Sequence, residues 1–177
     1  VSQQSGPVLL VGHSYGGAVI SEAGNMPNVV GLVYVAAFAP DAGESPASIT
    51  QLHLPVGAPN LAPDSDGYLW LKPEKFHESF GQDLTADEAL VMAVTQKAPL
   101  ASTFGDKVTA PAWANKPSWY QISSEDRMIH PENQKMMAAR MKPRKTITLA
   151  ASHASLASKA IDVSALIDEA ALELAKG

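Results

Sequence analysis

Ser14 is the residue whose surroundings point most directly to chemistry. It is the centre of a Gly-His-Ser-Tyr-Gly motif at positions 12–16, which follows an apolar run at 7–11 and precedes a helix-forming segment at 18–23. A serine on such a sharp turn between a buried strand and a helix is held with its hydroxyl above the carboxyl edge of the sheet. The motif therefore predicts a nucleophilic serine, and the alternative is an ordinary glycine-rich turn into a helix.

The neighbours of Ser14 fit this interpretation physically. The serine backbone is expected to be strained, and a Cβ atom at Gly12 or Gly16 is expected to collide with the crossing strand and helix. The N-terminus of the following helix favours negative charge. The backbone N–H of Tyr15 is therefore the expected donor to an oxyanion.

A nucleophilic serine needs a base, and the base needs an acid that orients it. Asp126 follows a predicted strand at 118–123, and His153 follows another at 146–150. Both stand at the carboxyl ends of predicted strands, at the same edge as Ser14, in the chain order serine, acid, histidine. We predict that Ser14, His153 and Asp126 form a catalytic triad.

Two other carboxylates are alternatives to Asp126. Glu125 is its neighbour, and Asp41 follows the predicted strand at 29–36, a position that supplies the acid in some hydrolases. Asp126 is favoured over both, partly because of the family resemblance described below.

The remaining histidines have other expected roles. His13 lies inside the motif and is expected to point the wrong way to serve the serine hydroxyl, while His130 is expected to cap a helix. His53 and His77 are expected at the surface. No His-x-x-x-His spacing occurs and the chain has no cysteine, so neither a metal ion nor a cofactor is expected.

The elements that must position these residues follow an α/β pattern. Short continuous apolar runs predict strands buried on both faces, and helices between them predict a parallel sheet that is covered on both sides. The clearest helix carries apolar residues at i, i+3, i+4 and i+7, and a second presents methionines. The predicted strands are 7–11, 29–36, 118–123 and 146–150; the clearest helix rests on Val163, Leu166, Ile167, Ala170, Ala171 and Leu174, and the second on Met136, Met137 and Met141.

The segment from about 42 to 114 is rich in proline and glycine. It is too long for a plain loop, and Thr85 and Glu88 form a capping-box signature that predicts a helix at about 86–97. We interpret this segment as a helical cap inserted into a single domain that spans 1–177. Four of its aromatic residues either line a substrate pocket or, the favoured alternative, form a small core of the cap; they are Trp70, Phe76, Phe80 and Trp113.

The composition is that of an ordinary globular domain: 177 residues, 46% hydrophobic and 18% charged, with a net charge of −5. The basic residues are scattered, so no nucleic-acid surface is expected. No apolar stretch approaches the roughly 18 residues of a membrane span, and no signal peptide is visible. Because the chain starts at Val1, almost directly before a strand, we expect upstream sequence to be missing; the expected compartment is cytoplasmic.

At these motifs the sequence resembles the α/β-hydrolase family. It is similar to the capped esterase branch that includes plant methyl-ester hydrolases and hydroxynitrile lyases. The resemblance implies that Ser14 is the nucleophile, His153 the base and Asp126 the acid, with a cap of short helices between the second and third strands. The matching segments are 8–17, 32–40, 124–129 and 152–155.

The family's sheet usually has eight strands, with the motif serine after the fifth. The resemblance therefore implies that this chain supplies strands five to eight and lacks one to four. The strand at 7–11 would be an apolar edge, which we expect to pair with the missing N-terminal half or with another copy in a homodimer. The family's second oxyanion donor, from the loop after the third strand, would also be absent, a loss that typically costs about 100- to 1,000-fold in turnover.

The predicted function is hydrolysis of a small-molecule carboxylic ester through an acyl-enzyme. One alternative is a hydroxynitrile-lyase-like reaction at the same site, which needs a positively charged cap residue near Ser14; Lys72, Lys75 and Lys97 are the candidates. Another alternative is a binding protein or an inactive fragment on a hydrolase scaffold.

Overall fold

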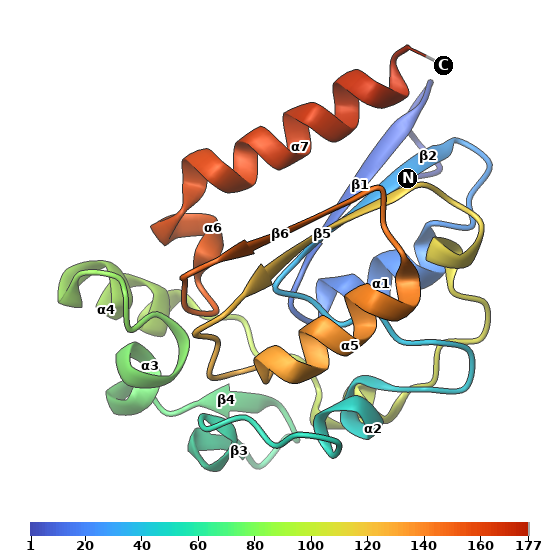
Figure 1. Cartoon of the computed structure of the whole chain (residues 1–177). Helices are drawn as coiled ribbons and strands as arrows, with labels where there is room; N and C mark the ends of the chain where they lie inside the picture. The colour runs from blue at the N-terminus through green and yellow to red at the C-terminus, as the bar shows by residue number, and fades with distance from the viewer. Residues whose placement is uncertain (177) are drawn as a thin grey trace.

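The computed structural model describes residues 1–176, and its centre is a four-stranded parallel sheet (Figure 1). The strand order is β1-β2-β5-β6, and all three neighbouring pairs are parallel. The α/β class and the four predicted strands are confirmed. The strands are β1 (Val8–His13), β2 (Val29–Val35), β5 (Ser118–Ser123) and β6 (Lys145–Leu149).

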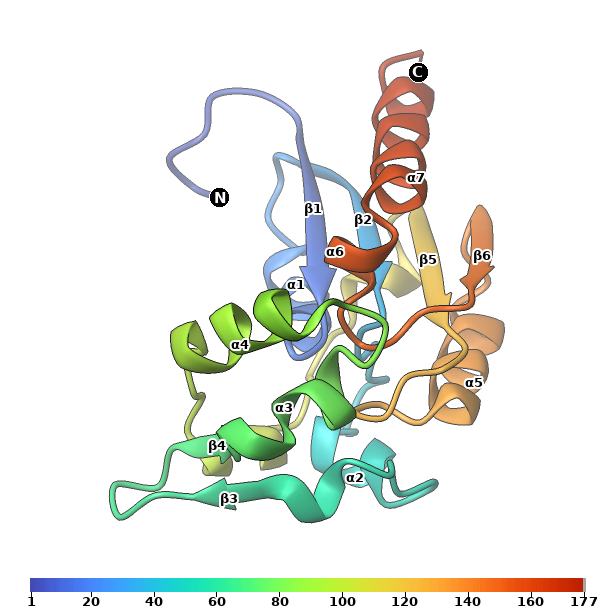
Figure 2. The same ribbon diagram turned by 90° about the vertical axis from the view of Figure 1, so that its left-hand side faces the viewer.

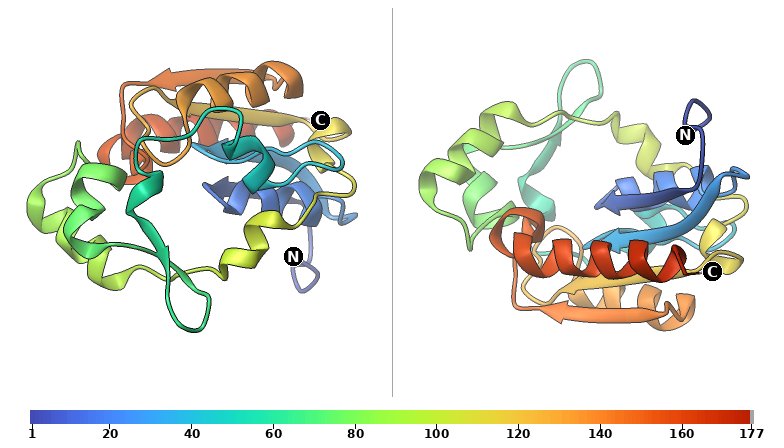
Figure 3. Two further views of the ribbon diagram at one scale, coloured as in Figure 1. Left: turned by 90° about the horizontal axis from the view of Figure 1, so that it is seen from below. Right: turned by 90° about the horizontal axis from the view of Figure 1, so that it is seen from above.

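Helices cover both faces of the sheet. Two of them, α1 and α5, pack on one face and α7 packs on the other, as Figures 1 and 3 show. The prediction for the apolar face of α7 is partly wrong. Ala171 is exposed, and the buried residues of this helix are Val163, Leu166 and Ala170. The helices are α1 (Gly16–Ala23), α5 (Pro131–Met141), the short α6 (Ser155–Ser158) and α7 (Ala160–Leu174).

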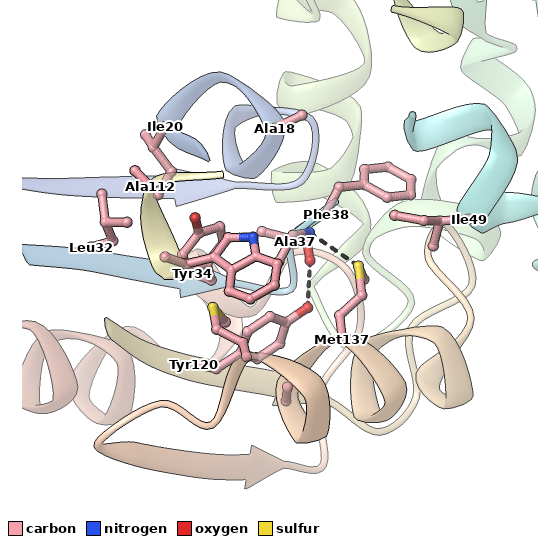
Figure 4. Packing of buried hydrophobic residues seen from close by; sticks show 14 of the residues in the cluster. Ala18, Ile20, Leu32, Tyr34, Ala37, Phe38, Ile49, Ala112, Tyr120 and Met137 are labelled. Atoms are coloured by element: carbon pink, nitrogen blue, oxygen red, sulfur yellow. Dashed lines mark hydrogen bonds between the residues drawn. The ribbon is translucent and has the colours of Figure 1, made fainter. Parts of the chain in front are cut away.

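Alternate side chains of the central strands enter two separate cores. Tyr34 faces α1 and α5, whereas Val35 faces α7. The rings of Tyr34 and Tyr120 stack with their centroids 5.9 Å apart. The Tyr120 hydroxyl donates to the backbone O of Ala37 (Figure 4), and the Tyr34 hydroxyl lies 2.9 Å from Oγ of Ser21. Because these buried hydroxyl groups have hydrogen-bond partners, they add order to the core without the penalty of an unpaired polar group.

β1 is an edge strand in the described part of the chain, where only β2 pairs with it. Its side chains are mostly half-buried, and Val11 is 41% exposed. The apolar edge predicted from the sequence is therefore present, and the identity of any partner at this edge stays a prediction.

Most of the segment between β2 and β5, whose residues 42–114 we call the cap, lies beyond the carboxyl ends of the strands (Figures 1 and 2), and its last residues pack against α1. The capping box of Thr85 and Glu88 is confirmed, and its helix ends at Thr95. The antiparallel pair β3-β4 was not predicted, because strands of three residues are too short to show a period. The cap elements are α2 (Pro46–Thr50), η1 (Ala58–Asn60), β3 (Leu61–Pro63), β4 (Leu69–Leu71), α3 (Pro73–Phe80), α4 (Ala86–Thr95), η2 (Ala101–Gly105) and η3 (Ala112–Ala114).

Candidate active site

Ser14 lies in the tight turn between β1 and α1. Its φ of 55° falls in the left-handed region, which costs free energy for a residue other than glycine. Backbone hydrogen bonds hold this conformation. The Ser14 O accepts from the N–H groups of Phe38 at 3.0 Å and Gly17 at 3.1 Å, and the Ser14 N–H donates to the O of Val35 at 3.3 Å. The turn is thus fixed by the end of β2 and the segment that follows it.

The glycines around Ser14 differ in how closely they are packed. A Cβ atom at Gly12 would lie 2.6 Å from the backbone O of Gly16, so the predicted collision is confirmed there. The same prediction is wrong for Gly16, where a Cβ atom would meet open space. The close approach is instead at Gly17, where a Cβ atom would lie 2.1 Å from the backbone O of Phe38, because α1 begins against the segment that follows β2.

Ser14, His153 and Asp126 come together at the carboxyl edge of the sheet. Oγ of Ser14 lies 2.8 Å from Nε2 of His153, and Nδ1 of His153 lies 2.7 Å from Oδ2 of Asp126. With an ionised carboxylate as acceptor, Nδ1 carries the ring proton and Nε2 is left to accept the serine proton. His153 and Asp126 are 1% and 4% exposed, so water does not compete for these hydrogen bonds.

The Asp126 carboxylate is fixed by further donors. Its Oδ1 accepts from the backbone N–H groups of Met128 at 2.7 Å and Ile129 at 2.9 Å. Its Oδ2 accepts from Nε2 of Gln134 at 2.8 Å, besides the bond from His153. The carboxylate therefore has little freedom to rotate away from the imidazole.

Gln134 is a residue of this site that sequence reasoning missed. Its side chain is fully buried, and its Nε2 also donates to the O of Ile129 at 2.9 Å, while its Oε1 accepts from the N–H of Ser123 at 3.0 Å. A signal was present, because Gln134 shares one face of α5 with Met137 and Met141. A polar side chain on the apolar face of a helix indicates a specific buried partner.

The two alternative acids lie away from His153. The side chain of Glu125 is exposed. Oδ2 of Asp41 lies 4.0 Å from Nε of Arg140 at the end of the segment after β2. In the described residues, the carboxylate in contact with His153 is that of Asp126.

The side chain of His13 lies beside His153 and makes no hydrogen bond to the Ser14 hydroxyl. Its Nε2 lies 2.8 Å from the backbone O of His153, so Nε2 carries a proton and donates it, and the two rings lie 4.7 Å apart. Burial lowers the pKa of His13 to about 4, and proximity to His153 lowers it too; the hydrogen bond to the His153 carbonyl and the charge of Asp126 oppose this change. His13 is therefore neutral at neutral pH.

The other histidines lie outside the site. Nδ1 of His130 accepts from the N–H of Glu132 at 3.2 Å, so the predicted helix cap is confirmed. His53 is exposed and stacks on His130 with the ring centroids 5.3 Å apart. His77 is exposed on α3, and its Nε2 donates to the backbone O of Leu84 at 3.0 Å.

The cap encloses a cavity of about 670 Å³ over Ser14 and His153. Its walls are mainly apolar, and Lys97 is the one lining residue with a charged ammonium group. Lys72 and Lys75 do not line it, and Lys75 pairs with Glu78 at 3.1 Å. The apolar wall includes Phe38, Leu61, Leu71, Met92, Phe104 and Met128.

The four cap aromatic residues that were singled out from the sequence divide between different roles. Phe76 and Phe80 line the cavity and also pack in a small cluster with Leu71, so both predicted alternatives apply to them. Both alternatives are wrong for the tryptophans. Trp70 is 38% exposed at the surface, and Trp113 belongs to the core between the sheet and α1.

Tyr15 is the residue that precedes the first turn of α1, and it lines the cavity next to Ser14. Its hydroxyl donates to the O of Thr103 at 3.2 Å, and its ring lies 5.1 Å from that of Phe104. These contacts fix the residue at a helix N-terminus, where backbone N–H groups lack intrahelical acceptors. The Tyr15 N–H therefore makes no hydrogen bond within α1.

Two kinds of feature are absent from residues 1–176. No group of three or more His, Cys, Asp or Glu side chains is arranged to hold a metal ion. None of the described helices combines the length and the apolar character needed to cross a bilayer.

Comparison with known proteins places the chain in a family. Curated proteins give no match. Among solved structures, a pyrethroid hydrolase from Sphingobium faniae has a TM-score of 0.73 at 22% identity, over 95% of this chain and 72% of that one. A methylesterase from Arabidopsis has a TM-score of 0.73 at 18% identity, over 96% and 72%. Tomato methylketone synthase I has a TM-score of 0.78 at 14% identity, over 97% and 73%.

At these identities the structural likeness shows a shared fold. The model of the alpha/beta hydrolase family matches residues 1–165, which is most of the sequence. The chain therefore belongs to the α/β-hydrolase family.

Proposed function

We propose that this protein is a serine hydrolase that cleaves carboxylic esters through an acyl-enzyme. The observation that carries the proposal is the continuous hydrogen-bonded chain from Ser14 Oγ through His153 to Asp126, with separations of 2.8 and 2.7 Å. Ser14 is the nucleophile, His153 the general base and Asp126 the acid that orients it.

In the first half of the reaction, Oγ of Ser14 attacks the ester carbonyl while Nε2 of His153 takes the serine proton. The C–O bond to the alcohol then breaks, and the imidazolium returns its proton to the leaving alcohol. In the second half, water attacks the acyl-enzyme, His153 takes a water proton, and Ser14 recovers it as the acid leaves. The backbone N–H of Tyr15 is the proposed donor to the oxyanion in both halves.

The cavity indicates the class of ester. Its walls are largely apolar and its volume of about 670 Å³ is within the range of sites for drug-sized molecules. An ester with a bulky apolar acyl or alcohol part would bury that part against Phe76, Phe80 and Met92. We therefore expect preference for hydrophobic esters over acetate esters.

Labelling with a fluorophosphonate, read by intact mass, tests the nucleophile. A single adduct on the wild type and none on Ser14→Ala is the expected result. A folded wild-type chain that takes no adduct would contradict the proposal and favour an inactive scaffold.

A series of p-nitrophenyl esters from acetate to octanoate then tests the substrate class. Each methylene that the cavity buries is worth about 0.8 kcal/mol, so kcat/KM should rise by up to about fourfold per methylene. A preference for acetate would contradict the assignment of the cavity as the acyl or alcohol site.

A lyase reaction on cyanohydrins is the second candidate, and one observation favours it. Lys97 lines the cavity that contains Ser14, so a positive charge is available to a departing cyanide. Release of cyanide from mandelonitrile, lost in both Ser14→Ala and Lys97→Met, would support the lyase. Ester hydrolysis that persists in Lys97→Met without cyanide release would support the esterase.

A further inference from the structure

The backbone of His153 is hydrogen-bonded to a residue of the serine motif at 12–16. Nε2 of His13 donates to the backbone O of His153 at 2.8 Å. His13 immediately precedes Ser14, so one end of the turn that presents the nucleophile also binds the peptide that presents the base. The separation of these two groups is thereby linked to the geometry of a single turn.

The cap also forms hydrogen bonds with the backbone on both sides of His153. The N–H of Ser152 donates to Oδ2 of Asp83 at 2.9 Å, and the N–H of Ala154 donates to the backbone O of Phe80 at 3.1 Å. Phe80 is the last residue of α3, and Asp83 lies in the turn that follows it. Residues 152–154 therefore make three consecutive backbone contacts, to two separate parts of the chain.

The end of α3 also contacts the loop that carries the acid. Nε2 of Gln82 donates to the O of Glu125 at 2.7 Å, and a guanidinium N–H of Arg127 donates to the O of Glu78 at 2.7 Å. Glu125 and Arg127 are the neighbours of Asp126 in the sequence. One short stretch of the cap thus contacts both loops that approach Ser14.

Asp83 is the charged member of these contacts. Burial raises the pKa of its carboxyl group, but hydrogen bonds from Ser152 outweigh burial and leave the pKa below its ordinary value. Asp83 is therefore ionised at neutral pH, and its hydrogen bond is charge-assisted. Ser152 is fully buried, so its N–H loses its partner if the carboxylate is removed.

On the basis of the proposed function, we propose that His13 and Asp83 are positioning residues, which hold the backbone of residues 152–154 and so keep His153 at hydrogen-bond distance from Ser14. Neither residue takes part in proton transfer. The loop after β6 has no regular secondary structure at 150–154, so these side chains supply the restraint that a helix or strand would give. Misplacement of a catalytic group by about 1 Å can cost on the order of 100-fold in rate.

Paired variants at each position test this proposal. Asp83→Ala and His13→Leu remove the contacts, whereas Asp83→Asn keeps a carbonyl acceptor and His13→Gln keeps an Nε2 donor. Asp66→Ala, at an exposed carboxylate in the β3–β4 turn, and His53→Leu, at an exposed histidine after α2, are matched controls. Asp83 does not line the cavity, so a loss in its variants is not a lost substrate contact.

Two readouts are needed on each folded variant, well below its unfolding temperature. The first is the rate of fluorophosphonate labelling at saturating reagent, and the second is hydrogen exchange of the segment 150–156. We expect Asp83→Ala and His13→Leu to label about 10- to 100-fold more slowly and to exchange faster in this segment. The conservative variants should recover both properties, and the controls should match the wild type.

Wild-type labelling rates in folded Asp83→Ala and His13→Leu would overturn the proposal, as would unchanged exchange at 150–156. A wild type that is not labelled at all refutes the proposed function separately. In that case exchange still decides whether the two residues hold the segment: unchanged exchange in Asp83→Ala and His13→Leu overturns the restraint, and faster exchange that Asp83→Asn and His13→Gln reverse supports it.

Discussion

Acid should destabilise this protein through His13. Burial lowers the pKa of His13 to about 4 in the folded protein, whereas a histidine in the unfolded chain titrates near pH 6.5. Above pH 6.5 both states are neutral and the residue has no effect on the pH dependence. As the pH falls from 6.5 to 4, His13 binds a proton in the unfolded chain but stays neutral in the folded protein. The free energy of unfolding therefore decreases across this window.

The size of the loss follows from the two pKa values. At pH 4.5 the difference amounts to about 2.5 kcal/mol of unfolding free energy, a large part of the 5–15 kcal/mol that is typical of a domain. Urea unfolding followed by tryptophan fluorescence at pH 7 and pH 4.5 measures it. His13→Gln keeps a donor to the His153 carbonyl but does not titrate, so it should lose about 2.5 kcal/mol less than the wild type between the two pH values.

His53→Gln is the matched control, because His53 is exposed in the loop after α2. It should keep the loss seen in the wild type. Equal losses in the wild type and His13→Gln would refute the reasoning, since the carboxylates common to both proteins would then account for all of the acid sensitivity.

Three further predictions concern packing, the acid and the sheet edge. Gly17→Ala should lower the free energy of unfolding by at least about 2 kcal/mol, because its Cβ atom would lie 2.1 Å from a backbone oxygen, whereas Gly16→Ala should be nearly neutral; urea unfolding compares them. Gln134→Met should cost about 1–3 kcal/mol of stability and slow fluorophosphonate labelling, since Ser123 loses an acceptor and Asp126 a donor; an unchanged labelling rate would contradict the role given to Gln134. Val11→Lys should reduce self-association on gel filtration if the β1 edge pairs between copies, and an unchanged elution volume would count against that pairing.

The strands and the order of the candidate site residues could be predicted because their signals are local. Continuous apolar runs locate β1 and β2, and short segments rich in aromatic or β-branched residues locate β5 and β6. A parallel sheet places the residues that follow such strands at one edge. Ser14, Asp126 and His153 each follow one of these strands. Their proximity is therefore a consequence of topology rather than of any contact visible in the sequence.

The contacts that restrain these residues could not be predicted in the same way. Gln134 reaches Asp126 across the first turn of α5, and His13 reaches a carbonyl that lies 140 positions away. Such contacts depend on the angle at which a helix or turn meets the sheet. The wrong prediction at Gly16 has the same origin, since the motif shows where the glycines are but not which of them faces the segment after β2.

The cap both forms the cavity wall and contacts the loops that carry Asp126 and His153. Its inner face forms much of the cavity wall, including Leu71, Phe76 and Met92, so substitutions there should alter which esters fit. The end of α3 and the turn after it, residues 78–83, contact the loops of Asp126 and His153. Phe80 belongs to both groups, since it lines the cavity and its ring packs edge-on against the imidazole of His153 with the centroids 4.7 Å apart. Substrate preference and the geometry of His153 are therefore coupled at Phe80, whereas Met92 lines the cavity and packs against the cluster of Leu71 and Phe76.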